Sequence, residues 1–301
     1  MGEPFLSLHD HLRGRLGEGK IRKIAIDAGF PCPNKDGRIG TGGCIFCDEY
    51  GSGPIAARGQ SVADQVAAAI ARHPGDRFIA YFQAHTGTAA PFHRLQGLYR
   101  EALADPRVVG LAVATRPDYL PEEVLPLWQE LAEKTLLWVE LGLQSIHERS
   151  LQYLRRRHTY PQFVEAVERL QGRGLAVIVH LIVGIPGETE ADLLATIAEM
   201  NRLKVAGIKV HLLHVLKNTT LEAMYRRGEV PLLEQDQYVE RVVALLRHLD
   251  PGIVVHRLTG ERDATLFVAP AWVQQKATVL RAIRRRLAEL GARQGDLTGQ
   301  G

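Results

Sequence analysis

The residues with the clearest capacity for chemistry are Cys32, Cys44 and Cys47, the only cysteines of the 301-residue chain. All three lie within one stretch of 16 residues, a clustering that random placement would give in about one case in a hundred. Two residues separate Cys44 from Cys47, so one tight turn presents two thiols, as metal chelation requires. The loop between Cys32 and Cys44 also contains Gly37, Gly40, Gly42 and Gly43. Glycines let the backbone pass close to a bulky group, so the pattern predicts a metal site.

Three kinds of cysteine site are consistent with this spacing. A zinc ion would need a fourth ligand; the loop holds no histidine, so Asp48 or a distant histidine would have to serve. A thioredoxin-like redox pair would leave the third cysteine without a role. A [4Fe–4S] cluster would use three thiolates and leave one iron with an open position. The spacing favours the cluster, while the zinc alternative stays open.

The elements that must position these cysteines are short apolar runs alternating with helical patterns. Strands are predicted at 21–27, 77–83, 108–115, 136–144, 175–184 and 207–216. Helices are predicted at 61–72, 93–104, 121–133, 161–172 and 189–203. Six consecutive strand–helix units imply parallel strands with right-handed crossovers. Because the cysteines follow the first strand, at the sheet edge where parallel α/β folds place their chemistry, we expect an α/β fold with a partial (βα)6 TIM-like barrel over 21–217.

The rest of the chain is expected to pack around this barrel. Residues 1–20 form an N-terminal extension, 218–290 a small C-terminal α/β appendage, and 291–301 a flexible glycine-rich tail. The appendage is predicted to contain helices at 219–227 and 234–249, a strand at 253–258 and a basic helix at 272–290.

Composition limits the class of protein. A hydrophobic fraction of 46% and a formal charge of +3 are ordinary for a globular protein, and too weakly basic to demand a nucleic-acid partner. The most apolar stretch, 175–183, is nine residues interrupted by His180, far too short to cross a bilayer. No signal-peptide pattern opens the chain, so we expect a cytoplasmic protein with no membrane partner.

The cysteine loop, FPCPNKDGRIGTGGCIFC, resembles that of the YhcC/YtqA-type radical S-adenosylmethionine (SAM) proteins, which are related to the Elongator catalytic-subunit class. Its spacing is wider than the CxxxCxxC of most radical SAM enzymes, a departure typical of this subgroup. Seven further motifs match in order: YFQAHTGTAAP, ATRPDYL, ELGLQS, RRRHT, HLIVGIPGET, HLLHVLKNT and HRLTGE. The resemblance therefore covers about residues 20–280.

The resemblance implies a [4Fe–4S] cluster held by Cys32, Cys44 and Cys47, with SAM bound at the open iron. An electron from a donor such as flavodoxin or ferredoxin would then cleave SAM to methionine and a 5′-deoxyadenosyl radical. The positions it implies for SAM binding are Gln83, Thr115, Gln144, Ser145, Arg156, His180, Gly184 and Pro186. Arg155 and Arg157 flank Arg156, so the register of that arginine is open. His180 stands where relatives often carry an aspartate, which puts the ribose contact in doubt.

The resemblance further implies an RNA substrate, because Elongator-class relatives modify the wobble uridine of tRNA. The residues expected near the substrate are Tyr81, Tyr119, His211, His214, Lys217 and Arg257. Residues 211 and 214 fall on opposite faces of a regular strand, so only one should point inward. Arg281, Arg284 and Arg285 of the basic helix would suit phosphate contacts, or equally a solvated helix face. A radical SAM enzyme acting on a metabolite or protein, and a non-catalytic iron–sulfur or zinc protein, are the alternatives.

Overall fold

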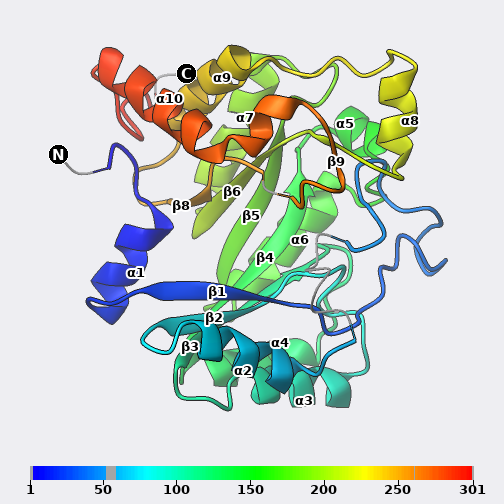
Figure 1. Cartoon of the computed structure of the whole chain (residues 1–301), viewed down its shortest axis with the longest axis vertical. Coiled ribbons are helices and arrows are strands. Elements are labelled where there is room, and N and C mark those ends of the chain that lie inside the picture. The colour runs from blue at the N-terminus through cyan, green and yellow to red at the C-terminus, as the bar shows by residue number, and fades with distance from the viewer. Residues whose placement is uncertain (1–2, 52–58, 261, 300–301) are drawn as a thin grey trace.

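The computed structural model describes residues 3–51, 59–260 and 262–299 and contains one large parallel sheet (Figure 1). Its strands, in spatial order, are β1 (Ile21–Ile26), β2 (Arg77–Phe82), β3 (Val108–Thr115), β4 (Leu136–Gln144), β5 (Ala176–Val183), β6 (Gly207–Leu212) and β8 (Val254–Arg257). Every neighbouring pair is parallel. The sheet curls into a partial barrel, which confirms the predicted fold class.

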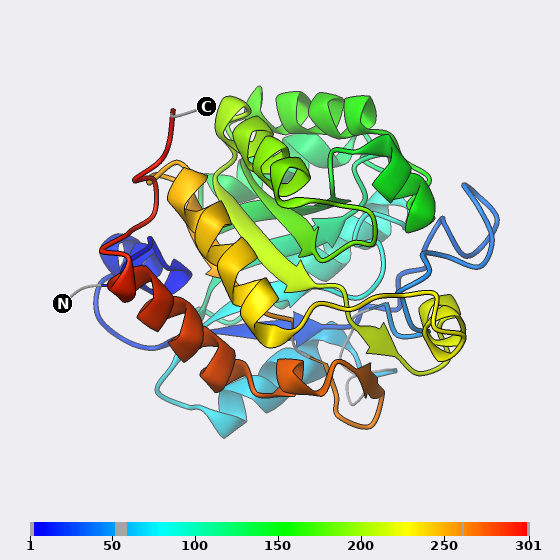
Figure 2. The ribbon, with the colours of Figure 1, turned by 90° about the horizontal axis from the view of Figure 1, so that it is seen from above.

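Helices cover the outer face of the sheet, as successive right-handed crossovers require (Figure 2). They are α2 (Val62–Arg72), α3 (Phe92–Ala102), α4 (Val124–Ala132), α6 (Tyr160–Gln171), α7 (Glu190–Arg202) and α9 (Gln235–His248). A short helix, α5 (Glu148–Tyr153), was not predicted. Outward-facing strand residues such as Val139 and Leu141 are fully buried beneath these helices and form the main core.

The inner face of the barrel is apolar near the amino ends of the strands and polar further along them. Ile79, Trp138 and Ile178 form a buried layer with Leu12 of helix α1 (Leu8–Leu16). The segment before α1 pairs with β8, because Ser7 bridges Val255 in parallel. The N-terminal extension therefore closes the end of the barrel opposite the carboxyl ends of the strands.

The C-terminal part, expected as an appendage packed on the barrel, contributes one strand to the main sheet. The strand predicted at 253–258 is β8, which extends the main sheet by pairing with β6. The strand predicted at 207–216 ends at Leu212, and Val215–Leu216 form a separate strand, β7, antiparallel to β9 (Phe267–Ala269). The remaining elements are α8 (Thr220–Arg226), the 3₁₀ helix η2 (Ala271–Gln274) and α10 (Lys276–Glu289), which packs along α9.

The segment expected as a flexible tail packs on the protein over residues 291–299. The Gln294 side chain is buried; its oxygen accepts from the Leu6 backbone N–H at 2.8 Å. Its amide nitrogen donates to the carbonyls of Asp250 and Ile253. Asp296 forms an ion pair with Arg247 on α9. Residues 300 and 301 lie outside the described residues.

Within the described ranges, no helix is both long and apolar enough to span a membrane.

Candidate functional site

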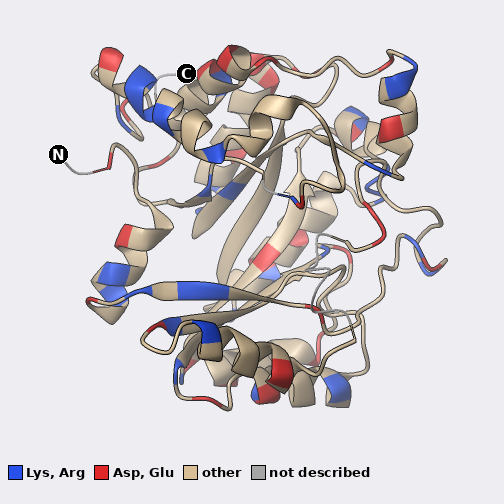
Figure 3. Ribbon diagram, viewed as in Figure 1, with Lys and Arg blue, Asp and Glu red and all other residues tan. Residues whose placement is uncertain are grey.

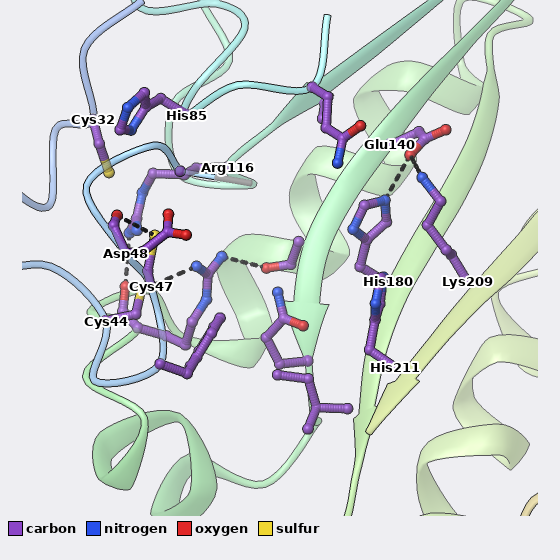
Figure 4. A pocket seen from close by; sticks show the side chains of 18 of the residues that line it. Cys32, Cys44, Cys47, Asp48, His85, Arg116, Glu140, His180, Lys209 and His211 are labelled. Atoms are coloured by element: carbon purple, nitrogen blue, oxygen red, sulfur yellow. Dashed lines mark hydrogen bonds and ion pairs between the residues drawn. The ribbon is translucent and has the colours of Figure 1, made fainter. Parts of the chain in front are cut away.

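A deep pocket opens at the carboxyl ends of the strands, with the cysteine loop on one side of it (Figure 4). It encloses about 1290 Å³, including the part open at its mouth. The residues predicted from the sequence that line it are Cys32, Cys44, Cys47, Tyr81, Gln83, Thr115, Gln144, Arg156, His180, His211, His214 and Arg257. Six strands and the loops that follow them thus bring these side chains to one cavity, although they span more than 200 positions of the sequence.

Three residues predicted to bind SAM lie away from the pocket lining. Ser145 is buried beneath it, where its hydroxyl donates to Glu188 at 2.5 Å. Gly184 and Pro186 belong to a turn behind the pocket; Gly184 has φ of 89°, which favours glycine. Ile185, between them, shares an apolar cluster with Ile45 of the cysteine loop. This turn supports the loop from behind rather than facing the cavity.

Two residues predicted near the substrate also lie outside the cavity. Tyr119 stands at the outer side of the cysteine loop, with the Arg38 guanidinium 5.1 Å from its ring centre. Lys217 is exposed after β7, and its backbone N–H donates to the Leu266 carbonyl at 2.8 Å. Neither is part of the pocket wall.

His211 and His214 both line the pocket, contrary to the expectation that only one would. Strand β6 ends at Leu212, so strict side-chain alternation does not extend to residue 214. A Cβ added at Gly260 would lie 3.3 Å from the His214 ring and 3.8 Å from Nδ1 of His211. The two imidazoles therefore flank the same glycine.

The cysteine loop is held in shape by its own backbone. The Cys32 carbonyl accepts from the N–H of Lys35 at 2.8 Å, and the Cys44 carbonyl accepts from the N–H of Cys47 at 3.1 Å. Gly42 and Gly43 have φ of 78° and 73°, conformations that side-chain-bearing residues rarely adopt. Within the second turn, buried Ile45 donates from its N–H to the Leu154 carbonyl and anchors the loop.

Two side chains donate toward the Cys44 sulfur. Nδ2 of Asn34 lies 3.4 Å from Sγ of Cys44, and Nη1 of Arg156 lies 3.3 Å from it. Both donors belong to buried residues, and Nε of Arg156 has no hydrogen-bond partner among the described residues. Arg116, ion-paired with Asp118, donates to the Arg156 carbonyl at 2.8 Å and fixes this segment. A buried guanidinium beside sulfur is the environment that stabilises a thiolate.

The cysteine end of the pocket fits an iron–sulfur cluster better than a single ion. Among the residues that the structure describes, no three His, Cys, Asp or Glu side chains stand close enough to hold one metal ion. Asp48 is engaged elsewhere: one carboxylate oxygen pairs with Arg262 and the other accepts from the Tyr50 N–H. A cluster binds each thiolate at a different iron, so its ligands surround a volume rather than a point. Burial raises the pKa of the Cys47 thiol to about 12, so its ionisation needs a cationic group such as iron.

The inner end of the pocket is organised around Glu140, a fully buried carboxylate on β4. One carboxylate oxygen accepts from Nζ of Lys23 at 3.2 Å and from Nε1 of Trp138 at 3.0 Å. The other accepts from Nε2 of His180 at 2.7 Å and from Nζ of Lys209. Lys209 also donates to the Tyr81 hydroxyl at 2.9 Å. Residues of β1, β2, β4, β5 and β6 thus share one hydrogen-bonded group. Figure 4 shows three of its members, Glu140, His180 and Lys209, across the cavity from the cysteines.

Burial and charge set the ionisation of this group. Burial opposes the charge of Glu140, but Lys209, Lys23 and His180 outweigh it and hold the pKa of this carboxyl well below its usual range. Burial lowers the pKa of Lys209 to about 7, and the charges of Lys23 and Arg257 act in the same direction. Burial likewise lowers the pKa of His180 to about 4, so this imidazole is neutral.

The sequence prediction missed several pocket residues, above all Glu140 and Lys209 as partners. A signal was present, because Glu140 interrupts the apolar run LLWVELGLQ and Lys209 the run GIKVHLL. A charged residue inside a buried strand needs a partner. The sequence does not show which residue is that partner, because this depends on the register of β4, β5 and β6. The other missed lining residues include Lys35, His85 and Arg262.

Comparison with protein families identifies the class of this chain. The model of the Radical SAM superfamily matches residues 35–200, and that of the Radical_SAM C-terminal domain matches residues 205–289. The chain therefore belongs to the radical SAM superfamily. The boundary between the two matches falls just before β6.

The similar proteins narrow this to one group. The chain is 40% identical over 298 residues to YtqA of Bacillus subtilis (97% of this chain, 92% of the relative). It is 35% identical over 291 residues to YhcC of Escherichia coli K12 (96% and 94%) and 32% identical over 285 residues to MJ0486 of Methanocaldococcus jannaschii (92% and 87%). These relatives confirm the resemblance seen in the sequence. Among solved structures, Methanocaldococcus infernus Elp3 aligns with a TM-score of 0.69 at 18% identity, over 92% of this chain and 64% of that one, and supports the fold.

Proposed function

We propose that this protein is a cytoplasmic radical SAM enzyme that holds a [4Fe–4S] cluster on Cys32, Cys44 and Cys47 and modifies a tRNA uridine at the wobble position. The observation that carries the first part is the set of three thiols at one end of a deep pocket in a radical SAM barrel, with Arg156 and Asn34 donating to Cys44. When bound and reduced by a donor such as flavodoxin or ferredoxin, the cluster supplies the electron that cleaves SAM to methionine and a 5′-deoxyadenosyl radical.

The protein's part in this chemistry is to bind and orient SAM. Gln83, Thr115 and Gln144 lie at the carboxyl ends of β2, β3 and β4, on the pocket wall. Their amide and hydroxyl groups suit the amino and ribose groups of SAM. Apolar lining from Phe46, Ile182 and Leu213 suits the adenine ring and limits water at the reacting end.

The proposal of an RNA substrate is supported by exposed cations at the cysteine loop. Arg155 and Arg157 are exposed, and neither side chain has a hydrogen bond or ion pair with another described residue. Arg157 lies over the loop, since a Cβ added at Gly40 would be 2.4 Å from its Nε. Two such guanidinium groups beside the pocket suit backbone phosphates.

The basic helix gives weaker support. On α10, Arg284 pairs with Glu3 at 2.9 Å and Arg285 with Glu289 at 3.4 Å. Figure 3 shows basic and acidic residues interspersed on the helices, α10 among them. These arginines match an ordinary solvated helix face.

Relatives with named substrates support RNA only at a distance. The tRNA uridine(34) acetyltransferase of Methanocaldococcus jannaschii is 30% identical over 169 residues, which are 55% of this chain and 30% of that protein. The shared part is thus about half of this chain.

The test is anaerobic reconstitution with iron and sulfide, followed by incubation with SAM, reductant and tRNA from a strain lacking the gene. We expect about four iron atoms per chain, 5′-deoxyadenosine formation, and a changed wobble nucleoside by mass spectrometry. S-adenosylhomocysteine without 5′-deoxyadenosine would contradict radical chemistry. One tightly bound zinc ion would contradict the cluster.

The RNA part is tested separately by the salt dependence of tRNA binding. Each lost phosphate contact flattens the log–log slope by about 0.7 to 0.9. We expect the double variant Arg155→Gln/Arg157→Gln to flatten this slope by roughly the amount expected for two lost phosphate contacts. The matched double variant Arg281→Gln/Arg285→Gln should leave the slope unchanged. Equal effects of both pairs would contradict binding at the cysteine loop, and absence of tRNA binding at low salt would leave a metabolite or protein substrate.

A further inference from the structure

The hydrogen-bonding capacity of Glu140 is fully used by the protein. A carboxylate offers about four acceptor positions, and its two oxygens accept from Lys23, Trp138, His180 and Lys209. No position is left for another cation or for substrate. Glu140 is therefore a positioning residue, which fixes Lys209 from across the barrel.

Lys209, in contrast, has unused capacity. Its ammonium group has three N–H donors, of which one meets Glu140 and one meets the Tyr81 hydroxyl. Its side chain is only 5% exposed, so bulk water does not readily satisfy the third. Lys209 lines the pocket, so that donor is available to a ligand.

Arg257 adds a second cation to this end of the pocket. It is the register partner of Lys209 on the neighbouring strand β8 and lines the same pocket. Its guanidinium makes no hydrogen bond or ion pair with any residue in the described part of the chain. It is only partly exposed, and its charge acts on His211 and His214 as well as on Lys209.

Among the described residues, the charges at this end of the pocket do not balance. In that part of the chain, Lys23, Lys209 and Arg257 face a single carboxylate, Glu140. The nearby imidazoles do not change this balance. Burial lowers the pKa of His180 and of His211, so both are neutral. Uncompensated charge in a largely buried site is costly, and an anion bound there would remove much of that cost.

We propose that Lys209 and Arg257 bind a carboxylate group of a small molecule that occupies the inner end of the pocket beside SAM. The depth of the site favours a small molecule over an RNA phosphate, because Lys209 lies inside the barrel. Arg257 offers the fork of donors that matches a carboxylate, and Lys209 a point charge at its side. Lys209 lies across the cavity from the cysteines (Figure 4). The SAM carboxylate is expected at the cysteine end, away from this site. As a second molecule beside SAM, this ligand rests on the proposed function.

The probe is malonate, titrated by calorimetry into the SAM-saturated holoprotein with the cluster oxidised, so that no turnover occurs. We expect malonate to bind at one site. Arg257→Gln should lower the malonate affinity about tenfold or more, and Arg257→Lys should lower it less. Arg257 makes no hydrogen bond or ion pair with another described residue, so we expect its replacement to leave the fold intact. The matched control is Arg72→Gln, an exposed arginine on α2, which should bind malonate as the wild type does. Absence of malonate binding to the wild type overturns the proposal.

Two further arms separate the possible sources of the anion. SAM titrated alone should bind Arg257→Gln within about twofold of the wild type; an equal loss of SAM and malonate affinity would assign Arg257 to the SAM carboxylate and overturn the proposal. Inorganic phosphate should bind more weakly than malonate. Tighter phosphate binding that tRNA abolishes would assign the site to RNA and overturn it.

Failure of the proposed function gives a different result. A wild type that forms no 5′-deoxyadenosine would contradict radical chemistry, whereas the calorimetric effect of Arg257→Gln is read without turnover. A wild type that forms 5′-deoxyadenosine but does not bind malonate would contradict only the anion site.

Discussion

Nη1 of Arg156 lies 3.3 Å from Sγ of Cys44, while Nη2 of the same guanidinium donates to the carbonyl of Gly142 on β4. One side chain therefore ties the cysteine loop to the carboxyl end of the central strand. Its neighbours Arg155 and Arg157 are exposed, so among the three consecutive arginines only Arg156 enters the pocket. The sequence left that register open.

This contact predicts an effect on the cluster potential. A positive charge and a hydrogen bond at a cluster sulfur stabilise the reduced state. We expect Arg156→Gln to lower the midpoint potential by about 60 mV, the one-electron equivalent of a hydrogen bond worth about 1.4 kcal/mol. A redox titration followed by electron paramagnetic resonance measures it. Arg155→Gln is the matched control, and equal potentials in both variants would remove Arg156 from the cluster environment.

The Glu140 group predicts a large effect on stability. Glu140→Gln leaves Lys209 buried without an anionic partner, which should lower the free energy of unfolding by about 3 kcal/mol. Urea unfolding of the apoprotein measures this. The control is Glu122→Gln, because Glu122 also pairs with two cations, Arg169 and Arg173, but on the surface; it should change little.

A double variant sharpens this test. Glu140→Leu/Lys209→Met removes the central pair together and should recover part of the stability lost in Glu140→Gln, since a buried charge is then no longer unpaired. A double variant less stable than Glu140→Gln would show that the group contributes more than charge balance.

Lys209 predicts how stability depends on pH. Its folded-state pKa is lowered from 10.5 to about 7, so between pH 7 and 10 the unfolded chain holds the additional proton. The free energy of unfolding should therefore rise with pH across this window, by at most about 1.4 kcal/mol per pH unit, and this contribution is lost as the pH falls through 7. The charged and titratable groups that face Lys209 are Lys23, Tyr81, Glu140, His180, His211 and Arg257.

The measurement is urea unfolding of the wild type and Lys209→Met at pH 7, 8 and 9. The free energy of unfolding of the wild type minus that of Lys209→Met isolates the effect of Lys209, because Glu140, with its lowered pKa, and the buried histidines keep the same charge over this range. This signed difference should rise with pH, and a fall with rising pH would contradict the assignment.

Substitutions of Gln144 should affect stability and SAM affinity differently. Gln144 has φ of 82°, a conformation that residues other than glycine rarely adopt, and it follows the register shift at Gly142. We expect Gln144→Gly to be more stable than Gln144→Ala by about 1 kcal/mol, since glycine relieves the strain. Both variants should lose SAM affinity equally in calorimetry. A larger loss of SAM affinity in Gln144→Gly would show that its backbone, not its side chain, makes the contact.

Local sequence patterns predict much of the fold and the cysteine end of the site. The cysteine spacing and the six apolar strands are readable residue by residue, because each depends on near neighbours in the chain. Glu140 was different: its partners come from β1, β5 and β6, and strand register decides which of them meet. The early end of β6 at Leu212 likewise brings His214 beside His211, which no strict alternation predicts.

The C-terminal region was harder for a similar reason. The strand at Val254–Arg257 is separated from β6 by about 40 residues with two helices between them, so its place in the main sheet is not visible in local patterns. Residues 291–299 are rich in glycine, which suggests a flexible tail, yet one buried glutamine, Gln294, holds them on the protein.

Helix α1 is made before every strand of the barrel, but the backbone partners of the segment before it come near the end of the chain. The backbone before it pairs with Val255, and the Leu6 N–H is held by Gln294. Closing so long a loop costs conformational entropy, and contacts offset this cost only once both partners have been synthesised. We therefore expect α1 to dock last during synthesis. Until then, Trp138 and Ile178 lie open at the amino end of the barrel, without Leu12 above them. This apolar patch is where a nascent or partly unfolded chain should be most prone to capture by chaperones or to aggregation.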